Sequence, residues 1–171
     1  MPIKQISVFI ENTPGSLQAM TGVLADHNID MRALSLAETE DFGIARIIVD
    51  DVFTASTVLK DAGYIHNLTN VVGVSIPDTP GGLNKVLSVF TAEKINVDYM
   101  YAFMGGKETA HAYMIFRVND PIAAAAALNS RGIKLVRQDE MTNLLWGAPS
   151  GIDESLFSPF RHPDTRVNRS K

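Results

Sequence analysis

The 171-residue chain contains no cysteine, only one tryptophan, and no apolar run near the roughly 18 residues that a membrane span needs. Without cysteine, disulfides, thiolate metal sites and cysteine nucleophiles are all excluded. The 15 basic residues are outnumbered by 19 acidic ones, so the net charge is −4. A protein that binds the nucleic-acid backbone needs a basic surface. The first residues, Met1–Gln5, do not resemble a signal peptide. We therefore expect a cytoplasmic protein that binds neither nucleic acid nor membranes.

The composition is that of a globular protein with a substantial core. Hydrophobic residues make up 46% of the chain and charged residues 20%, which is too apolar for a disordered protein. The length suits either one domain of middle size or two small ones.

An internal repeat decides between these two possibilities. Thr13–Leu17 reads TPGSL, and Thr79–Leu83 reads TPGGL 66 residues later. Gly63 and Gly132 match at an offset of 69. The extra residues fall in a predicted turn, Met104–Glu108, where two copies of one fold tolerate an insertion. The sequence therefore predicts a first domain over residues 1–70, a second over 71–146 and a tail over 147–171, which is rich in Pro, Ser and Gly.

Each copy has the same predicted order of elements, which is strand, helix, hairpin, helix and strand. A βαββαβ order closes into a ferredoxin-like sandwich of the α+β class. We expect the two sandwiches to pair side by side with the helices on one face. This pairing forms either an eight-stranded sheet within one chain or an equivalent arrangement across a dimer.

The helices have recognisable start and stop residues. A threonine hydroxyl can cap the first helix of each copy, and the following proline suits the first helical position. An aspartate can cap the second helix, and a glycine can end it. In chain order these residues are Thr13, Pro14, Asp51 and Gly63 in the first copy, and Thr79, Pro80, Asp120 and Gly132 in the second.

One strand of the second copy has an aromatic face. Tyr99, Tyr101 and Phe103 alternate and share that face, whereas the matching strand of the first copy has the small residues Ala33 and Ser35. The aromatic face could belong to a core, a sheet-to-sheet interface or a stacking platform. The small residues of the matching strand favour an interface, as if another surface packs against them.

Arg46 and the four histidines are weaker candidates for function. Arg46 lies in a predicted strand, where it either faces solvent, which we favour, or faces the other copy and holds a carboxylate. The histidines have no spacing typical of a metal site, so we expect neither a metal nor another cofactor.

The loop before the first helix of each copy resembles that of the ACT domain. Asn12–Leu17 and Asp78–Leu83 both read Asn/Asp-x-Pro-Gly-x-Leu, and Asn28–Asp30 and Ile95–Val97 lead into the next strand as in that family. The resemblance extends from residue 4 to about residue 145 and is strongest to small stand-alone proteins with two ACT domains. It implies a regulatory module for a small molecule, usually an amino acid, bound where the first loop of one domain faces its neighbour. Some ACT domains bind no ligand and only dimerise.

The chemistry of these loops agrees with an amino-acid ligand. The start of a helix, with its free N–H groups, suits a carboxylate, and glycine lets the ligand approach the backbone. For the ammonium group, Asp78 offers a full charge where Asn12 offers an amide, so the second loop is expected to bind better. The expected ligand-binding residues are Asn12, Thr13, Gly15, Ser16, Leu17, Asn28, Ile29 and Asp30 in the first copy, and Asp78, Thr79, Gly81, Gly82, Leu83, Ile95, Asn96 and Val97 in the second.

We therefore expect a non-catalytic amino-acid sensor that forms a homodimer and acts on a partner enzyme. One alternative is a dimerisation module that acts on a partner enzyme without ligand. An enzyme on this fold is less favoured, because the sequence shows no Ser–His–acid set and no phosphate-binding loop. An RNA-binding sheet would need aromatics on a third strand within a basic face, but Ile44–Val49 has none.

Overall fold

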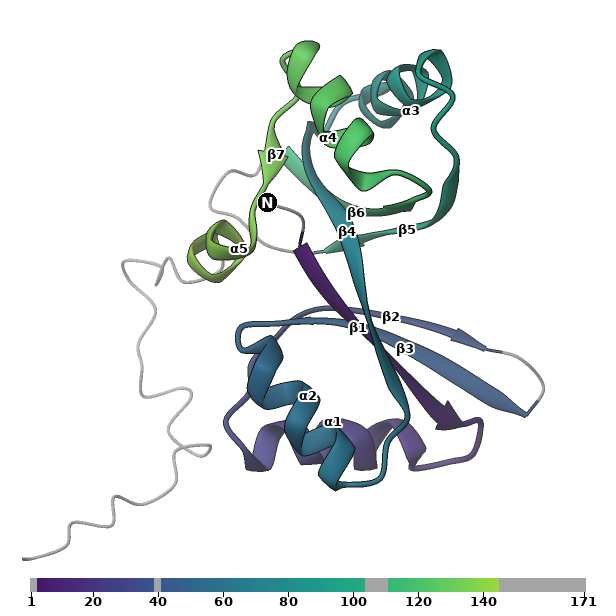
Figure 1. Ribbon diagram of the computed structural model, residues 1–171, viewed down its shortest axis with the longest axis vertical. Helices are drawn as coiled ribbons and strands as arrows, with labels where there is room; N and C mark the ends of the chain where they lie inside the picture. Colours follow the sequence, from purple (N-terminus) through teal and green to yellow (C-terminus); the bar gives the residue numbers. More distant parts are fainter. Residues whose placement is uncertain (1–2, 39–40, 104–110, 145–171) are drawn as a thin grey trace, which may run out of the picture.

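The fold is seen in a computed structural model, which describes residues 3–38, 41–103 and 111–144 (Figure 1). The expected tail, 147–171, and the turn Met104–Glu108 lie outside the described residues. No helix within the described ranges is long and apolar enough to span a membrane. The elements are β1 (Ile3–Glu11), α1 (Ser16–Asp26), β2 (Met31–Glu38), β3 (Phe42–Val49), α2 (Val52–Asp61), β4 (His66–Pro77), α3 (Gly82–Ala92), β5 (Val97–Phe103), β6 (His111–Val118), α4 (Pro121–Ser130), β7 (Leu135–Val136) and α5 (Gln138–Leu144).

The βαββαβ order occurs twice, and this confirms the α+β fold predicted from the repeat. The strands form one sheet in the order β2-β3-β1-β4-β6-β5, with β7 also paired to β4. This sheet has seven strands in the described part of the chain, not the expected eight. The reason is that β4 is continuous: it is the last strand of the first copy and the first strand of the second. It therefore runs through residue 70, where we expected the first copy to end.

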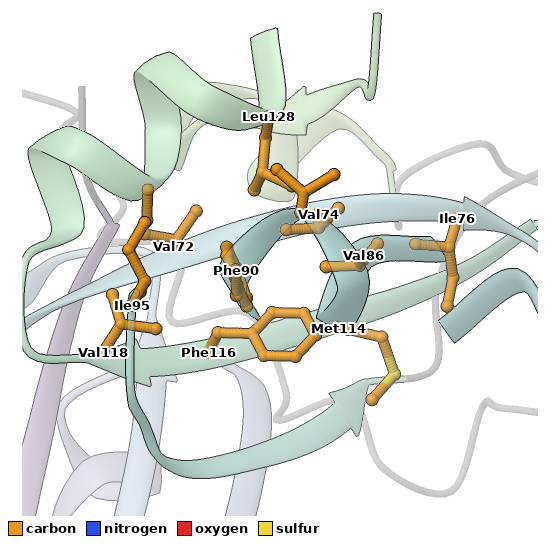
Figure 2. Packing of buried hydrophobic residues seen from close by; sticks show 12 residues of the cluster. Val72, Val74, Ile76, Val86, Phe90, Ile95, Met114, Phe116, Val118 and Leu128 are labelled. Atoms are coloured by element: carbon orange, nitrogen blue, oxygen red, sulfur yellow. The ribbon is translucent and has the colours of Figure 1, made fainter. Parts of the chain in front are cut away.

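Each pair of helices covers its own hydrophobic core on one face of the sheet. Val72, Val74 and Ile76 pack under α3 and α4, around an edge-to-face pair formed by Phe90 and Phe116, whose ring centroids lie 5.4 Å apart (Figure 2). The first copy has an equivalent core under α1 and α2. Figure 1 shows the two helix layers at opposite ends of the molecule, with the strands between them. The sheet thus curls, and both helix layers lie on its outer face.

A third core lies between the two halves of the curled sheet. Ala33 of β2, Phe103 of β5 and Val71 of β4 are buried together there, and Tyr101 packs against them. This arrangement confirms the predicted interface, because aromatic residues of the second copy share one core with Ala33 of the first. It also agrees with the residue sizes, because a close-packed core needs a small residue where large aromatic ones are packed.

The short helix α5 was not predicted from the sequence. It begins at Gln138, whose side-chain oxygen accepts from the Lys4 N–H at 3.1 Å and whose amide donates to the Val49 carbonyl at 3.0 Å. Met141 of this helix is fully buried in the core between the two halves. The helix therefore follows the second copy in sequence but is hydrogen-bonded to the first.

The predicted caps of the second helices are confirmed. Asp51 accepts from the Thr54 N–H at 3.0 Å, and Asp120 accepts from the N–H groups of Ile122 and Ala123 at 3.1 and 2.9 Å. The hydroxyl and the N–H of Thr54 lower the pKa of the Asp51 carboxyl. The predicted stop residues also hold, because Gly63 and Gly132 have φ values of 85° and 70°.

The predicted caps of the first helices are wrong. α1 begins at Ser16 and α3 at Gly82, each preceded by a glycine in the left-handed region, with φ of 92° at Gly15 and 84° at Gly81. The threonine and the proline therefore lie in a turn before the helix. A left-handed residue reverses the chain direction, so the helix can start only after it.

Replacing Asp120 with alanine is expected to lower the free energy of unfolding by about 1 kcal/mol, because two N–H groups at the start of α4 lose their acceptor. Urea denaturation of the full chain measures this change. Asp120→Asn is the control, since an amide oxygen also caps helices. If the asparagine and alanine variants were equally destabilised, charge and not capping would be the cause.

Candidate ligand-binding loops

The loop before α1 is held by short-range bonds. The Ser16 N–H donates to the Thr13 carbonyl at 3.2 Å, and the two hydroxyls of Thr13 and Ser16 lie 2.7 Å apart. The Asn12 N–H donates to the Asp41 carbonyl at 3.2 Å, which joins the loop to the start of β3. Gly15 has no side chain with which to cap the first turn of α1. The start of this helix is therefore open to an anion.

The loop before α3 is tighter. The Thr79 N–H donates to the Pro77 carbonyl, and the Gly82 N–H donates to the Thr79 carbonyl, both at 2.9 Å. The Pro77 carbonyl oxygen lies so close to Gly82 that a Cβ at this position would overlap it. Asp78 is exposed, and its carboxylate makes no hydrogen bond or ion pair with any residue in the described part of the chain. In this loop, the Asp78 carboxylate without a partner in the described structure thus lies near the start of α3, which has no side-chain cap.

The structure does not bring all the expected site residues together. Glu11, at the end of β1, pairs with Phe42, whereas Met31, at the start of β2, pairs with Val49 at the other end of β3. The prediction that Asn28–Asp30 lies beside the first loop is therefore wrong. The physical reason is that the helix between them carries the chain roughly 16 Å back along the sheet.

The second copy shows the same separation. Val97 pairs with Val118, whereas Pro77, just before the second loop, pairs with His111 at the opposite end of β6. Within one chain, Ile95–Val97 therefore lies away from Asp78, and the prediction that it shares that end of the fold is wrong.

The residues that lead into β2 and β5 have structural partners instead. Asp50 accepts from the Asp30 N–H, and Asn119 accepts from the Asn96 N–H, both at 3.0 Å. Asn28 has a φ of 55°, a left-handed conformation that asparagine tolerates better than most residues. These hydrogen bonds and the left-handed backbone of Asn28 account for the residues at the entries to β2 and β5, with no need for a ligand.

The two loops also lie far from each other. β4 begins at His66, opposite Val8 of β1, and runs in the other direction to Pro77. The loops therefore lie at opposite ends of β4, which at 12 residues spans about 36 Å. Figure 1 shows the end of β1 and the end of β4 in different halves of the molecule. Within one chain, neither loop faces the other.

A polar network that the sequence analysis missed joins the two halves. Gln5 of β1 is fully buried, and its amide donates to the Tyr99 hydroxyl at 2.7 Å and to Ser7 Oγ at 2.9 Å. The Tyr101 hydroxyl donates to Gln5 Oε1 at 2.9 Å. Burial raises the pKa of the Tyr101 hydroxyl, which therefore stays protonated. One side chain thus bonds to two tyrosines of the other copy.

Arg46 of β3 belongs to the same network. Its guanidinium carbon lies 4.1 Å from the centroid of the Tyr99 ring, a cation–π contact. The favoured expectation that Arg46 faces solvent is therefore wrong, because the second half of the sheet covers it. It faces the other copy, as the second interpretation had it, but contacts an aromatic ring and not a carboxylate.

Comparison with known proteins gives two kinds of match. A family model described as an ACT domain pair matches residues 1–145. Protein BT0572 from Bacteroides thetaiotaomicron has a similar crystal structure with a TM-score of 0.78 and 38% identity, over 84% of this chain and 98% of that one. No curated protein matches the sequence.

More distant structures share the fold. The ligand-free regulatory subunit of aspartate kinase from Thermus thermophilus is 17% identical, over 76% of this chain and 93% of that one, with a TM-score of 0.58. The corresponding subunit from Thermus flavus is also 17% identical, over 76% of this chain and 92% of that one, with a TM-score of 0.55.

Proposed function

Since the chain belongs to the ACT domain family, with two such domains in tandem, we propose that it is a non-catalytic regulatory protein that binds an amino acid. The observation that carries this proposal is the second loop. There, the exposed Asp78 carboxylate has no partner in the described structure and lies four residues before α3, a helix without a side-chain cap. The two features complement the two charged groups of an amino acid.

Each charged group has a distinct place in this proposal. The ligand carboxylate binds the free N–H groups in the first turn of α3, where the helix dipole favours an anion. The ligand ammonium binds Asp78 through a charge-assisted bond. In the first loop, Asn12 stands in the place of Asp78 and brings no charge, so the second loop is the stronger site.

We further propose that a second copy of the chain completes the site in a homodimer. The two loops of one chain lie at opposite ends of β4, so the neighbour that closes a loop has to come from another chain. β2 and β5 are the outer strands of the sheet order and each leaves one edge unpaired in the described structure, which supports pairing side by side. A partner enzyme and a cytoplasmic location belong to the same proposal. The Thermus neighbours are themselves regulatory subunits of a kinase.

Replacing Asp78 with alanine is expected to weaken amino-acid binding at least tenfold, because the ligand ammonium loses its carboxylate. A thermal-shift panel of the twenty amino acids identifies the ligand, since binding to the native state raises the melting temperature by mass action. Titration of that ligand against the wild type and Asp78→Ala then measures the loss.

The repeat provides the matched control, Asn12→Ala. This variant removes the equivalent side chain from the first loop and is expected to leave most of the affinity. If no amino acid shifted the melting temperature, a dimerisation module without ligand would be the better description. If Asp78→Ala bound as tightly as the wild type, the ligand would lie elsewhere.

A further inference from the structure

A cavity lies apart from both candidate loops, between α4, β7 and the start of α5. Its volume is about 470 Å³, which is within the range of small-molecule sites. The buried side chains of Val72 and Val136 form its floor, and Ala125 and Ile122 of α4 line its wall. Ile122 is 79% exposed, so the wall ends in an apolar side chain at the surface.

The repeat shows which residues stand at the corresponding place in the first copy. Ala125 corresponds to Ser56, and Leu135 corresponds to His66. Ser56 Oγ and His66 Nε2 are 2.7 Å apart and hydrogen-bonded, so a polar contact joins α2 to β4. In the second copy, Ala125 is too short and Leu135 too apolar to make such a bond. The two copies therefore have different residue types at corresponding places between the second helix and the last strand.

Some polar groups around the cavity have hydrogen-bond or ion-pair partners, and others have none in the described part of the chain. The Glu140 carboxylate accepts from the Arg137 N–H at 2.9 Å, and the Arg137 guanidinium pairs with Asp139 at 3.2 Å. The Lys134 ammonium has neither a hydrogen bond nor an ion pair among residues 3–38, 41–103 and 111–144. The Asn129 amide also lines the cavity and is free of side-chain bonds within those ranges. The available groups thus favour an anion.

From this geometry we propose that the cavity binds a monocarboxylate with an apolar body, such as a medium-chain fatty acid. The hydrocarbon lies on Val72, Ala125 and Leu135, and the carboxylate pairs with Lys134 at the rim and accepts from Asn129. A free amino acid binds poorly here, because the one acidic group of the lining, Glu140, already holds the start of α5 and offers no carboxylate for an ammonium. The site shares no residue with the two loops, so it is independent of the function proposed above.

The position of the cavity gives such a ligand a route to the first copy. Arg137 and Glu140 line the cavity at the start of α5, and Gln138 between them bonds to Lys4 and Val49 of the first copy. A ligand on this wall therefore contacts a helix that is hydrogen-bonded to the first copy, and binding is expected to stabilise that contact.

Methyl and amide NMR spectra of the full chain, titrated with sodium octanoate, test the proposal. We expect saturable shifts of Val72, Ala125 and Leu135, and no such shifts with octylammonium or leucine at the same concentrations. Lys134→Gln is expected to weaken octanoate binding about tenfold, because a charge-assisted bond becomes a neutral one.

A filling variant and its neighbour distinguish this cavity from other apolar surface. Ala125→Leu is expected to abolish the octanoate shifts, whereas Ala126→Leu, on the exposed side of the same helix, leaves them. Shifts that survive Ala125→Leu, equal binding of octylammonium, or no saturation up to 10 mM octanoate would each overturn the proposal. Loss of amino-acid binding at the Asp78 loop would not, because the two sites share no residue.

Discussion

Replacing Gln5 with alanine is expected to lower the free energy of unfolding by about 3 kcal/mol. The truncation removes the only side chain that bonds to both Tyr99 and Tyr101 in the described structure. The partly buried Tyr101 hydroxyl would lose its acceptor, at a place where Gln5 itself is fully buried. A buried polar group without a partner costs more than the bond itself contributes.

Guanidinium denaturation of three variants separates this effect from simple truncation. Gln18→Ala makes the same substitution on the exposed face of α1 and is expected to change stability by less than about 0.5 kcal/mol. Tyr101→Phe removes one bond of the network and is expected to cost about 1 kcal/mol. The double variant, Gln5→Ala with Tyr101→Phe, is expected to lose less than the sum of the single changes, because the two side chains are in contact.

The network is expected to have a second signature. With the Gln5 bridge removed, β1 and β5 lose the polar contact between them, whereas the apolar core, the Gln138 bonds and β4 still join the two halves. Amide exchange should therefore accelerate across β5 and the start of β1 more than in the outer helices. If Gln5→Ala were no more destabilising than Gln18→Ala, water would satisfy the tyrosines, and the Gln5 bridge would contribute little to holding the two halves together.

Tyr99, Tyr101, Phe103 and Ala33 show what the sequence could predict about the interface. Two matched strands with opposite side-chain sizes indicate that the faces pack together, because cores require complementary volumes. Gln5 was not predictable by the same argument. A polar residue in an alternating strand reads as solvent-facing, and its burial depends on a tyrosine 94 positions away in the chain. The repeat predicts the helices and strands of each half, but contacts between residues far apart in the chain determine which polar residues are buried.

The candidate site was predictable only in part for a related reason. The motif around Asp78 located an open helix start, which follows from local sequence. Whether Ile95–Val97 shares that end of the fold depends on how far α3 carries the chain, and the motif does not encode this distance. The continuous β4 was missed for a similar reason. A repeat of two separate copies predicts that one strand ends and another begins near residue 70, whereas β4 runs from the first copy into the second.

Gly82→Ala is expected to destabilise the protein by about 2 kcal/mol, because the new Cβ overlaps the backbone carbonyl oxygen of Pro77. A backbone atom cannot rotate away as a side chain does, so the start of α3 has to move. The same movement displaces the N–H groups that we propose hold the ligand carboxylate. Gly82→Ala is therefore expected to weaken amino-acid binding as well as stability, and calorimetry at a temperature well below unfolding separates the two effects.

The first copy provides the matched control, since Ser16 stands where Gly82 does. Ser16→Ala removes only the contact between two exposed hydroxyls and is expected to cost well under 1 kcal/mol. Because serine is already tolerated there, the two loops differ in how closely the preceding strand approaches the helix. Equal destabilisation by the two substitutions would mean that the carbonyl of Pro77 yields at little cost. A stable Gly82→Ala variant with weakened binding would instead place the sensitivity in the position of the helix start, the element on which the proposed site depends.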